Sequence, residues 1–86
     1  MQQLVTISIL STNRQETSAK LNQVLTSNGH LIMSRLGVNV QKTCTEHCPG
    51  MIVLVLKDES EKIKQFIKEL EAISELEVKC CFFEEK

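Results

Sequence analysis

The chain has 86 residues, enough for one small domain with a single core. Ten Lys and Arg residues oppose eleven Asp and Glu residues, a net charge of −1, and this balance argues against a nucleic-acid binding protein, which usually shows a basic excess. Three aromatic residues, none of them Trp or Tyr, offer little surface for base stacking. No apolar run approaches the ~20 residues of a membrane span. We therefore expect neither direct nucleic-acid binding nor a membrane partner.

The first ten residues lack the basic stretch and the continuous apolar run of a secretion signal. This pattern predicts a cytoplasmic protein. Its four cysteines are then expected to be reduced, so metal or redox chemistry competes with simple burial as the explanation for them.

The first half of the chain reads as a strand, a helix and a second strand. Leu4–Leu10 alternates and is rich in β-branched residues, which predicts a strand. Ser11–Asn13 can cap a helix over Glu16–Ser27, and Asn28-Gly29 would end it. The predicted buried stripe of this helix is Leu21, Val24 and Leu25.

The second predicted strand is His30–Lys42, within which Gly37 indicates a bulge or bend. Thr43–Gly50 reads as a connection that closes with Pro49-Gly50. Met51–Leu56 is apolar on both faces and is therefore expected in the centre of the sheet.

The last third of the chain predicts a helix and a fourth strand. Asp58–Glu61 is expected to cap the helix, and Leu76–Phe83 is the strand. The apolar stripe of the helix is Ile63, Phe66, Ile67, Leu70 and Ile73.

Two βαβ units in this length predict an α+β fold, the ferredoxin-like βαββαβ plait. Right-handed crossovers leave a gap between the first two strands. The third strand fills this gap, which gives a four-stranded antiparallel sheet of order 4-1-3-2 with both helices on one face.

The opposite face of this sheet is predicted to be open and apolar. It would show Leu4, Leu10 and Met33, together with either Met51, Val53 and Val55 or Ile52, Leu54 and Leu56. Because an open apolar face on a small domain usually marks an interface, we expect a homodimer or a homotetramer.

Cys44-Thr45-Glu46-His47-Cys48 is the one constellation with metal-binding chemistry. Its two thiols and imidazole are soft donors that suit Zn, Ni or Cu, with Zn or Ni as the expected metal, although the spacing is C-x3-C rather than the commoner C-x2-C. Glu46, water or another subunit would have to complete the shell. An unligated loop and a Cys44–Cys48 disulfide remain alternatives, and the sequence implies no other cofactor.

The remaining chemistry-bearing residues do not form a catalytic motif. Cys80 and Cys81 would lie at the other end of the sheet from Cys44 and Cys48 and point to opposite faces, so we expect small core and surface residues. His30 reads as a turn residue. There is no nucleophile elbow and no glycine-rich phosphate loop, which favours a protein that is not an enzyme.

Three segments, Ser34–Val40, Met51–Lys57 and Lys68–Lys79, resemble the small regulators of the iron-only hydrogenase system. The resemblance covers nearly the whole chain and implies one ACT-like, ferredoxin-like domain over residues 1–86. It also implies a regulatory or ligand-sensing role. We expect this role to act through oligomerisation or a partner protein, because the plait leaves no room for a DNA-binding helix pair.

ACT-like domains bind small effectors at subunit interfaces near the first strand–helix turn. On this resemblance, Thr12, Asn13 and Arg14 are the expected ligand-binding residues, beside Ser11 and next to a helix N-terminus that favours anions. The alternative is that Thr12 and Asn13 only cap the helix. A metal-binding accessory protein that uses Cys44, His47 and Cys48 is the competing function, by analogy with the similar plait of nickel-responsive repressors.

Overall fold

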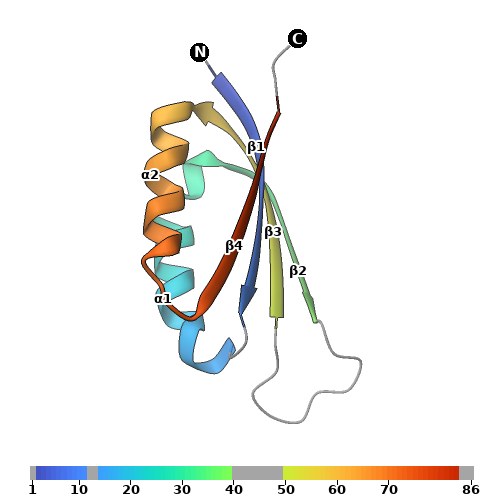
Figure 1. Cartoon of the computed structure of the whole chain (residues 1–86), viewed down its shortest axis with the longest axis vertical. Helices are drawn as coiled ribbons and strands as arrows, with labels where there is room; N and C mark the ends of the chain where they lie inside the picture. Colours follow the sequence, from blue (N-terminus) through green and yellow to red (C-terminus); the bar gives the residue numbers. More distant parts are fainter. Residues whose placement is uncertain (1, 12–13, 40–49, 84–86) are drawn as a thin grey trace.

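The computed structural model describes residues 2–11, 14–39 and 50–83 (Figure 1). The elements are β1 (Gln2–Ser11), α1 (Arg14–Ser27), a 3-10 turn (Gly29–Leu31), β2 (Ile32–Asn39), β3 (Gly50–Glu59), α2 (Ser60–Glu71) and β4 (Leu76–Phe83). Within these residues no helix combines the length and the apolar character needed to cross a membrane.

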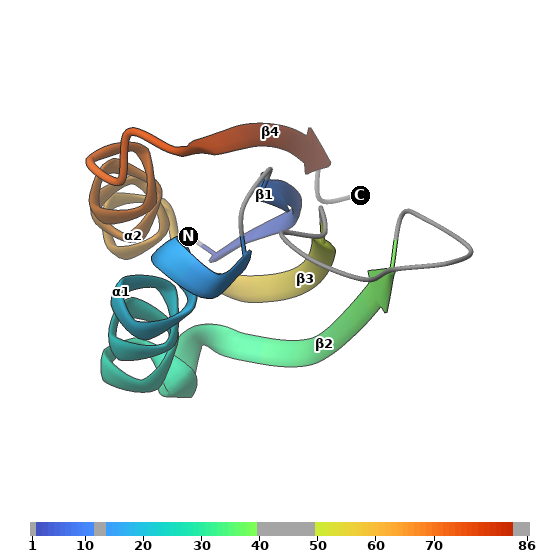
Figure 2. The ribbon, with the colours of Figure 1, turned by 90° about the horizontal axis from the view of Figure 1, so that it is seen from below.

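The four strands form one sheet in the order β2-β3-β1-β4, and each neighbouring pair is antiparallel. Both helices lie on the same face of this sheet (Figure 2). The predicted ferredoxin-like plait and its strand order are therefore confirmed. The apolar strand β3 is central because it pairs with β1 on one side and with β2 on the other.

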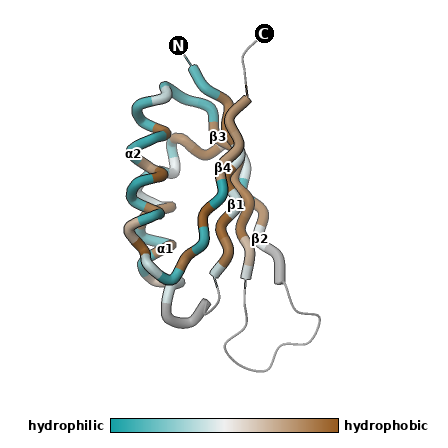
Figure 3. The backbone as a smooth tube through the Cα atoms, viewed as in Figure 1, coloured by the Kyte–Doolittle hydropathy of each residue, from teal (hydrophilic) through white to brown (hydrophobic). Residues whose placement is uncertain are grey.

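Strand alternation separates a buried face from an open one. Val5, Ile7 and Ile9 are buried, and Ile7 pairs with Leu54, so the even-numbered residues of β3 face the helices. Of the two sets considered for the open face, the correct one is thus Met51, Val53 and Val55. Figure 3 shows β1 and β3 as largely apolar, except at their upper ends near the N-terminus, which are hydrophilic.

The helices close the core with the predicted stripes. Leu21 and Leu25 of α1 are buried, as are Ile63, Phe66 and Leu70 of α2, while Val24 and Ile67 pack partly against the core. The Asn28 side-chain amide joins the two helices. It donates to the Val24 carbonyl oxygen at 2.9 Å and to Glu69 Oε2 at 3.1 Å.

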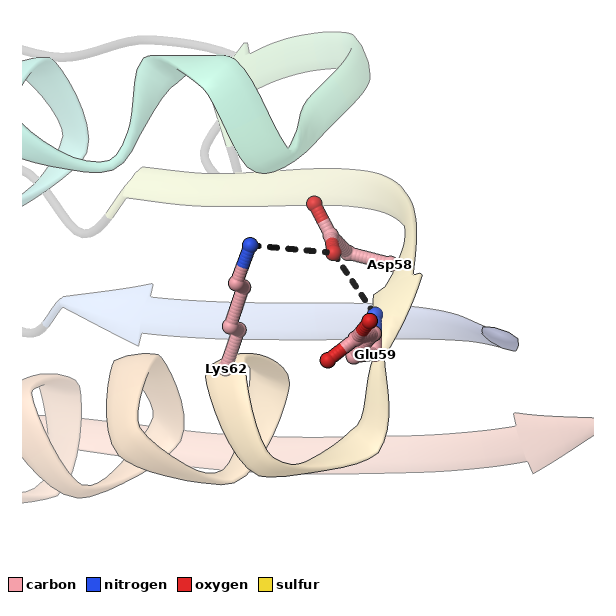
Figure 4. Close-up of polar contacts among 3 residues, drawn as sticks. All are labelled: Asp58, Glu59 and Lys62. Carbon is pink, nitrogen blue, oxygen red and sulfur yellow. Dashed lines mark hydrogen bonds and ion pairs between the residues drawn. The ribbon is translucent and has the colours of Figure 1, made fainter. Parts of the chain in front are cut away.

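The junction between β3 and α2 differs from the predicted cap. The strand continues to Glu59 and the helix begins at the next residue, with no side-chain hydrogen bond from the N-cap Glu59. Asp58 Oδ1 accepts a 2.7 Å bond from the Glu59 backbone N–H and lies 3.9 Å from Lys62 Nζ (Figure 4). This carboxylate also places negative charge near the positive end of the α2 dipole.

The irregularity in β2 is at Met33 rather than at Gly37. Ile32 pairs with Leu56, but Ser34 already pairs with Val55, so one extra residue stands in β2. The extra residue changes the parity of the strand: Arg35 and Gly37 lie opposite Leu54 and Ile52, on the helix side. Leu36 is on the open face and 60% exposed.

The last strand keeps its predicted bounds but not its predicted burial. Cys80 pairs with Ile7 and Cys81 with Thr6, which confirms that they point to opposite faces. Both thiols are nevertheless exposed, so the expectation of a core cysteine is wrong. The physical reason is that β4 is an edge strand: only Leu76 and Val78, near its start, are half-buried.

Candidate functional site

A cavity of about 400 Å³ opens between α1 and the sheet, at the end where β1 finishes and β3 begins (the lower end in Figure 1). Its lining comes from the three strands β1, β2 and β3 and from α1. The lining residues are Ile9, Ser11, Thr17, Ser18, Leu21, Asn22, Arg35, Gly37, Gly50, Met51 and Ile52.

Two glycines on the helix side of the sheet explain why this space is not filled. Gly37 lies opposite Ile52, and Gly50 lies opposite Ser11. A Cβ built on Gly37 would meet no heavy atom within 4 Å, so this position faces open space. The cavity therefore results from missing side chains at inward-facing strand positions.

A buried hydroxyl pair fixes one wall of the cavity. Ser11 Oγ and Thr17 Oγ1 are 2.6 Å apart, and the two residues are only 4% and 1% exposed. The pair joins the end of β1 to the first half of α1. It holds the helix at a defined position while Ser18 and Asn22, four residues apart and thus on one helix face, add polar groups to the lining.

Arg35 supplies the charge of the cavity. It is the only charged residue in the described lining, and its side chain is exposed on β2. The ion pairs found within residues 2–11, 14–39 and 50–83 are Lys62–Asp58 and Lys79–Glu77, and neither involves Arg35. A guanidinium presents five N–H donors in a planar fork that suits oxyanions.

Most of the site residues predicted from the sequence lie outside the residues that the structure describes. Thr12 and Asn13 lie outside the described residues, as do Cys44, His47 and Cys48. Arg14 begins α1, and its side chain is not among those described. Within the described ranges, no group of three or more His, Cys, Asp or Glu residues is arranged to hold a metal ion.

Ser11, at the end of β1, lines the cavity and also belongs to the turn that the family resemblance indicated. Sequence reasoning missed Arg35 and Gly37 as site residues. A signal for them was present, because Arg-x-Gly within a strand places a charge and a missing side chain on the same face. The extra residue at Met33 decides whether Arg35 and Gly37 lie on the helix side or on the open face of the sheet. No residue type in the sequence indicates a bulge at this position.

Cys80, outside the cavity, is a titratable group whose environment changes its pKa. Partial burial raises the pKa of its thiol, and the carboxylate of Glu71 raises this pKa further. Both effects keep the thiol protonated, which lowers its reactivity as a nucleophile. The environment of Cys80 is therefore the opposite of one that activates a catalytic cysteine.

Three of the solved structures with the same fold have sequences that differ widely from that of this chain. The uncharacterized protein TM1266 from Thermotoga maritima matches with a TM-score of 0.84 at 23% identity, over 98% of this chain and 100% of that one. SnoaB, a cofactor-independent oxygenase from Streptomyces nogalater, matches at 0.60 and 5% identity, over 100% and 95%. The periplasmic divalent cation tolerance protein CutA from Archaeoglobus fulgidus matches at 0.52 and 14%, over 100% and 85%.

These identities are low, so the likeness shows a shared fold and no shared activity. A comparison with curated proteins found no match. A family model, described as "Iron-only hydrogenase system regulator, putative", matches residues 3–80. This match covers both helices and most of the sheet, and the chain belongs to the TM1266-like family.

Proposed function

We propose that this chain is a non-enzymatic regulatory domain that binds a small-molecule effector in the cavity between α1 and β2. The observation that carries the proposal is the cavity itself, which combines apolar walls, polar side chains and one arginine. Ligand sites commonly have this composition, in which apolar surface provides affinity and a few polar groups orient the ligand. The description of the family as a regulator of the iron-only hydrogenase system agrees with it.

The polar groups of the described lining support binding rather than catalysis. They are a guanidinium, an amide and three hydroxyls, groups that donate and accept hydrogen bonds but do not exchange protons readily near neutral pH. Burial and the Glu71 carboxylate raise the pKa of the Cys80 thiol, which holds it in its unreactive form. We place this regulatory domain in the cytoplasm.

The open sheet face supports regulation through self-association, and we propose a second copy of this chain as its partner. On this face Leu10 pairs with Met51, while Val53 and Val55 pair with Ser8 and Thr6 and Leu4 pairs with Lys57. Beside them, Leu36 and Phe83 are 60% and 46% exposed. An apolar surface that spans neighbouring strands is typical of interfaces. A homodimer or homotetramer would cover it.

Thermal denaturation in the presence of a metabolite library tests effector binding. A ligand that binds only the folded state raises the melting temperature, because at 100 Kd it adds about 2.7 kcal/mol to the free energy of unfolding. The matched variant is Gly37→Val, whose side chain points into the cavity. We expect ligands that stabilise the wild type to lose their effect on this variant. Catalytic conversion of a stabilising ligand would contradict a non-enzymatic role.

Sedimentation of the wild type and of Val53→Asp tests self-association. Val53 is on the open face, so the added charge should dissociate the oligomer and leave the monomer folded. Gln23→Asp, at an exposed position of α1, adds the same charge elsewhere and should have no effect. A wild type that sediments as a monomer at micromolar concentration would exclude this part of the proposal.

Metal binding through Cys44, His47 and Cys48 is the second candidate function. It depends on three donors within five residues, in the segment that joins β2 to β3. Zn or Ni binding would release protons and weaken as the pH falls, because thiolates are the ligands. Stoichiometric metal in protein purified without an affinity tag would support this function. Undiminished binding by the Cys44→Ser, Cys48→Ser double variant would exclude it.

A further inference from the structure

We propose that the cavity binds a small organic carboxylate, with the carboxylate group on Arg35 and an apolar chain over Ile9, Leu21 and Ile52. This inference rests on the proposed function, since it names the class of effector that the cavity takes. It adds Arg35 as the residue that determines the charge of the ligand and Gly37 as the residue that determines its size.

The charge of the lining favours an anion. Arg35 is the only charged side chain in the described lining, so no described residue of the wall offers a carboxylate that would compete with a ligand. No ion pair of the described residues uses this guanidinium. A carboxylate can accept two parallel N–H bonds from an arginine, and such charge-assisted bonds are stronger than neutral ones.

The position of Arg35 in the sheet directs it to the cavity. Arg35 pairs with Leu54, which is fully buried beneath the helices, and paired residues of neighbouring strands point to the same face. Arg35 and Gly37 therefore share the helix side of β2. If the extra residue at Met33 were absent, both would lie on the open face.

The other lining residues divide into an apolar part and a polar part. Ile9 and Leu21 are buried members of the core, and Ile52 packs against it, so they form an apolar floor. Ser18 and Asn22 are exposed on one face of α1, across from β2. A ligand that satisfies both parts has a short hydrocarbon chain and a hydroxyl or carbonyl group near its carboxylate.

The volume limits the size of the ligand. About 400 Å³ is near the lower end of the roughly 300–1,000 Å³ range of ligand sites. A small metabolite fits this space better than a large cofactor. The free space next to Gly37 is part of that volume, so any side chain at this position reduces it.

Titration followed by amide NMR tests the proposal with lactate, 2-hydroxybutyrate and 2-hydroxyisovalerate, a series whose apolar group grows by one carbon at each step. We expect chemical-shift changes at Gly37, Gly50 and the Asn22 side chain. Affinity should rise by up to about fourfold per added methylene, since each buried methylene contributes about 0.8 kcal/mol. The corresponding neutral amides should bind at least about tenfold more weakly, because they lose the charge-assisted bonds.

Three variants separate the parts of the argument. Arg35→Gln should weaken binding of the acids by about tenfold or more, and Gly37→Val should abolish it. Lys20→Gln removes the same charge from an exposed position of α1 that is not part of the lining, and it should leave the affinity unchanged. Because Arg35 and Gly37 are exposed, these variants are expected to fold, and circular dichroism checks this.

The outcomes also distinguish this inference from the proposed function. If Arg35→Gln binds the acids as well as the wild type, or if amides or inorganic phosphate bind as tightly as the acids, the carboxylate assignment is wrong. Absence of binding by all three acids at millimolar concentration also overturns it. The proposed function survives these results if another ligand stabilises the wild type but not Gly37→Val, and fails only if none does.

Discussion

The face of the sheet that carries the helices has two unlike regions. Under α2, the side chains of Ile63, Phe66 and Leu70 are fully buried and fill the space above β1 and β3. Under the first half of α1, the same sheet face is hollow and polar groups line the space. Both regions belong to one small fold, and both are covered by a helix (Figure 2).

The difference lies in which residues occupy the inward-facing positions. The inward positions of α2 are large and apolar, whereas α1 places Thr17 one turn before Leu21. The strands differ in the same way, since β3 contributes Leu54 and Leu56 to the filled region but β2 contributes Gly37 to the hollow one. The cavity thus results from the small and polar residues at these positions. It differs from a packing defect, which is a gap among large apolar side chains.

The largest predicted effect comes from placing a charge in the filled region. Leu54→Asp puts a carboxylate at a position with 0% exposure, and burial of an unpaired charge should cost more than about 3 kcal/mol of unfolding free energy. Val53→Asp is the adjacent control on the open face and should keep the fold. Urea denaturation of both variants measures the difference, and equal losses would contradict the assignment of the two faces.

The second prediction concerns the hydroxyl pair at the wall of the hollow region. Ser11→Ala removes the bond to Thr17 within a buried environment and should cost about 1–2 kcal/mol. Ser8→Ala, on the open face of the same strand, should change the free energy of unfolding by less than about 0.5 kcal/mol. If the two substitutions had equal effects, the 2.6 Å contact would not position α1.

The third prediction is a substitution that should barely affect stability. Gly37→Val introduces a β-branched side chain into open space on a strand, so the change should stay within about 1 kcal/mol. Thermal and urea denaturation measure it. A loss of several kcal/mol, as expected for overpacking of a filled core, would show that the space beside Gly37 does not exist in solution.

The filled region could be predicted from the sequence, and the hollow one could not. Two periodic patterns of large apolar side chains identify a strand and a helix together with their buried faces. They are the alternation of Val5, Ile7 and Ile9 and the helical spacing of Ile63, Phe66 and Leu70. The strand order follows from the same pattern and from the handedness of crossovers. The cavity depends instead on side chains that are missing, and apolar periodicity carries no information about them.

Two further differences have local physical causes. The bulge at Met33 reverses the faces of Arg35 and Leu36, and a one-residue shift of this kind leaves the composition of a strand unchanged. The exposure of Cys80 depends on how far α2 extends over an edge strand, which is a property of the packed fold. The predicted sites at Thr12–Arg14 and Cys44–Cys48 stay predictions, since the described side chains do not include them.

The smallest predicted effect is a difference in rate between the two neighbouring thiols of β4. Both are exposed, and the pKa of the Cys80 thiol is raised, first by desolvation and then by Glu71. With Cys44 and Cys48 replaced by Ser, iodoacetamide at mildly alkaline pH should alkylate Cys81 several-fold faster, because only thiolates react. Mass spectrometry of the peptides measures both rates.

Glu71→Gln sharpens this comparison, since it removes one cause of the shift and should accelerate Cys80 alone. The raised pKa also makes the free energy of unfolding depend on pH. The folded state holds the Cys80 proton to a higher pH than the unfolded state does, so the free energy of unfolding falls as the pH rises above the pKa of the unfolded state. Cys80→Ser should therefore lessen the loss of stability at alkaline pH. Equal alkylation rates at Cys80 and Cys81 would show that desolvation near α2 does not distinguish the two sides of β4.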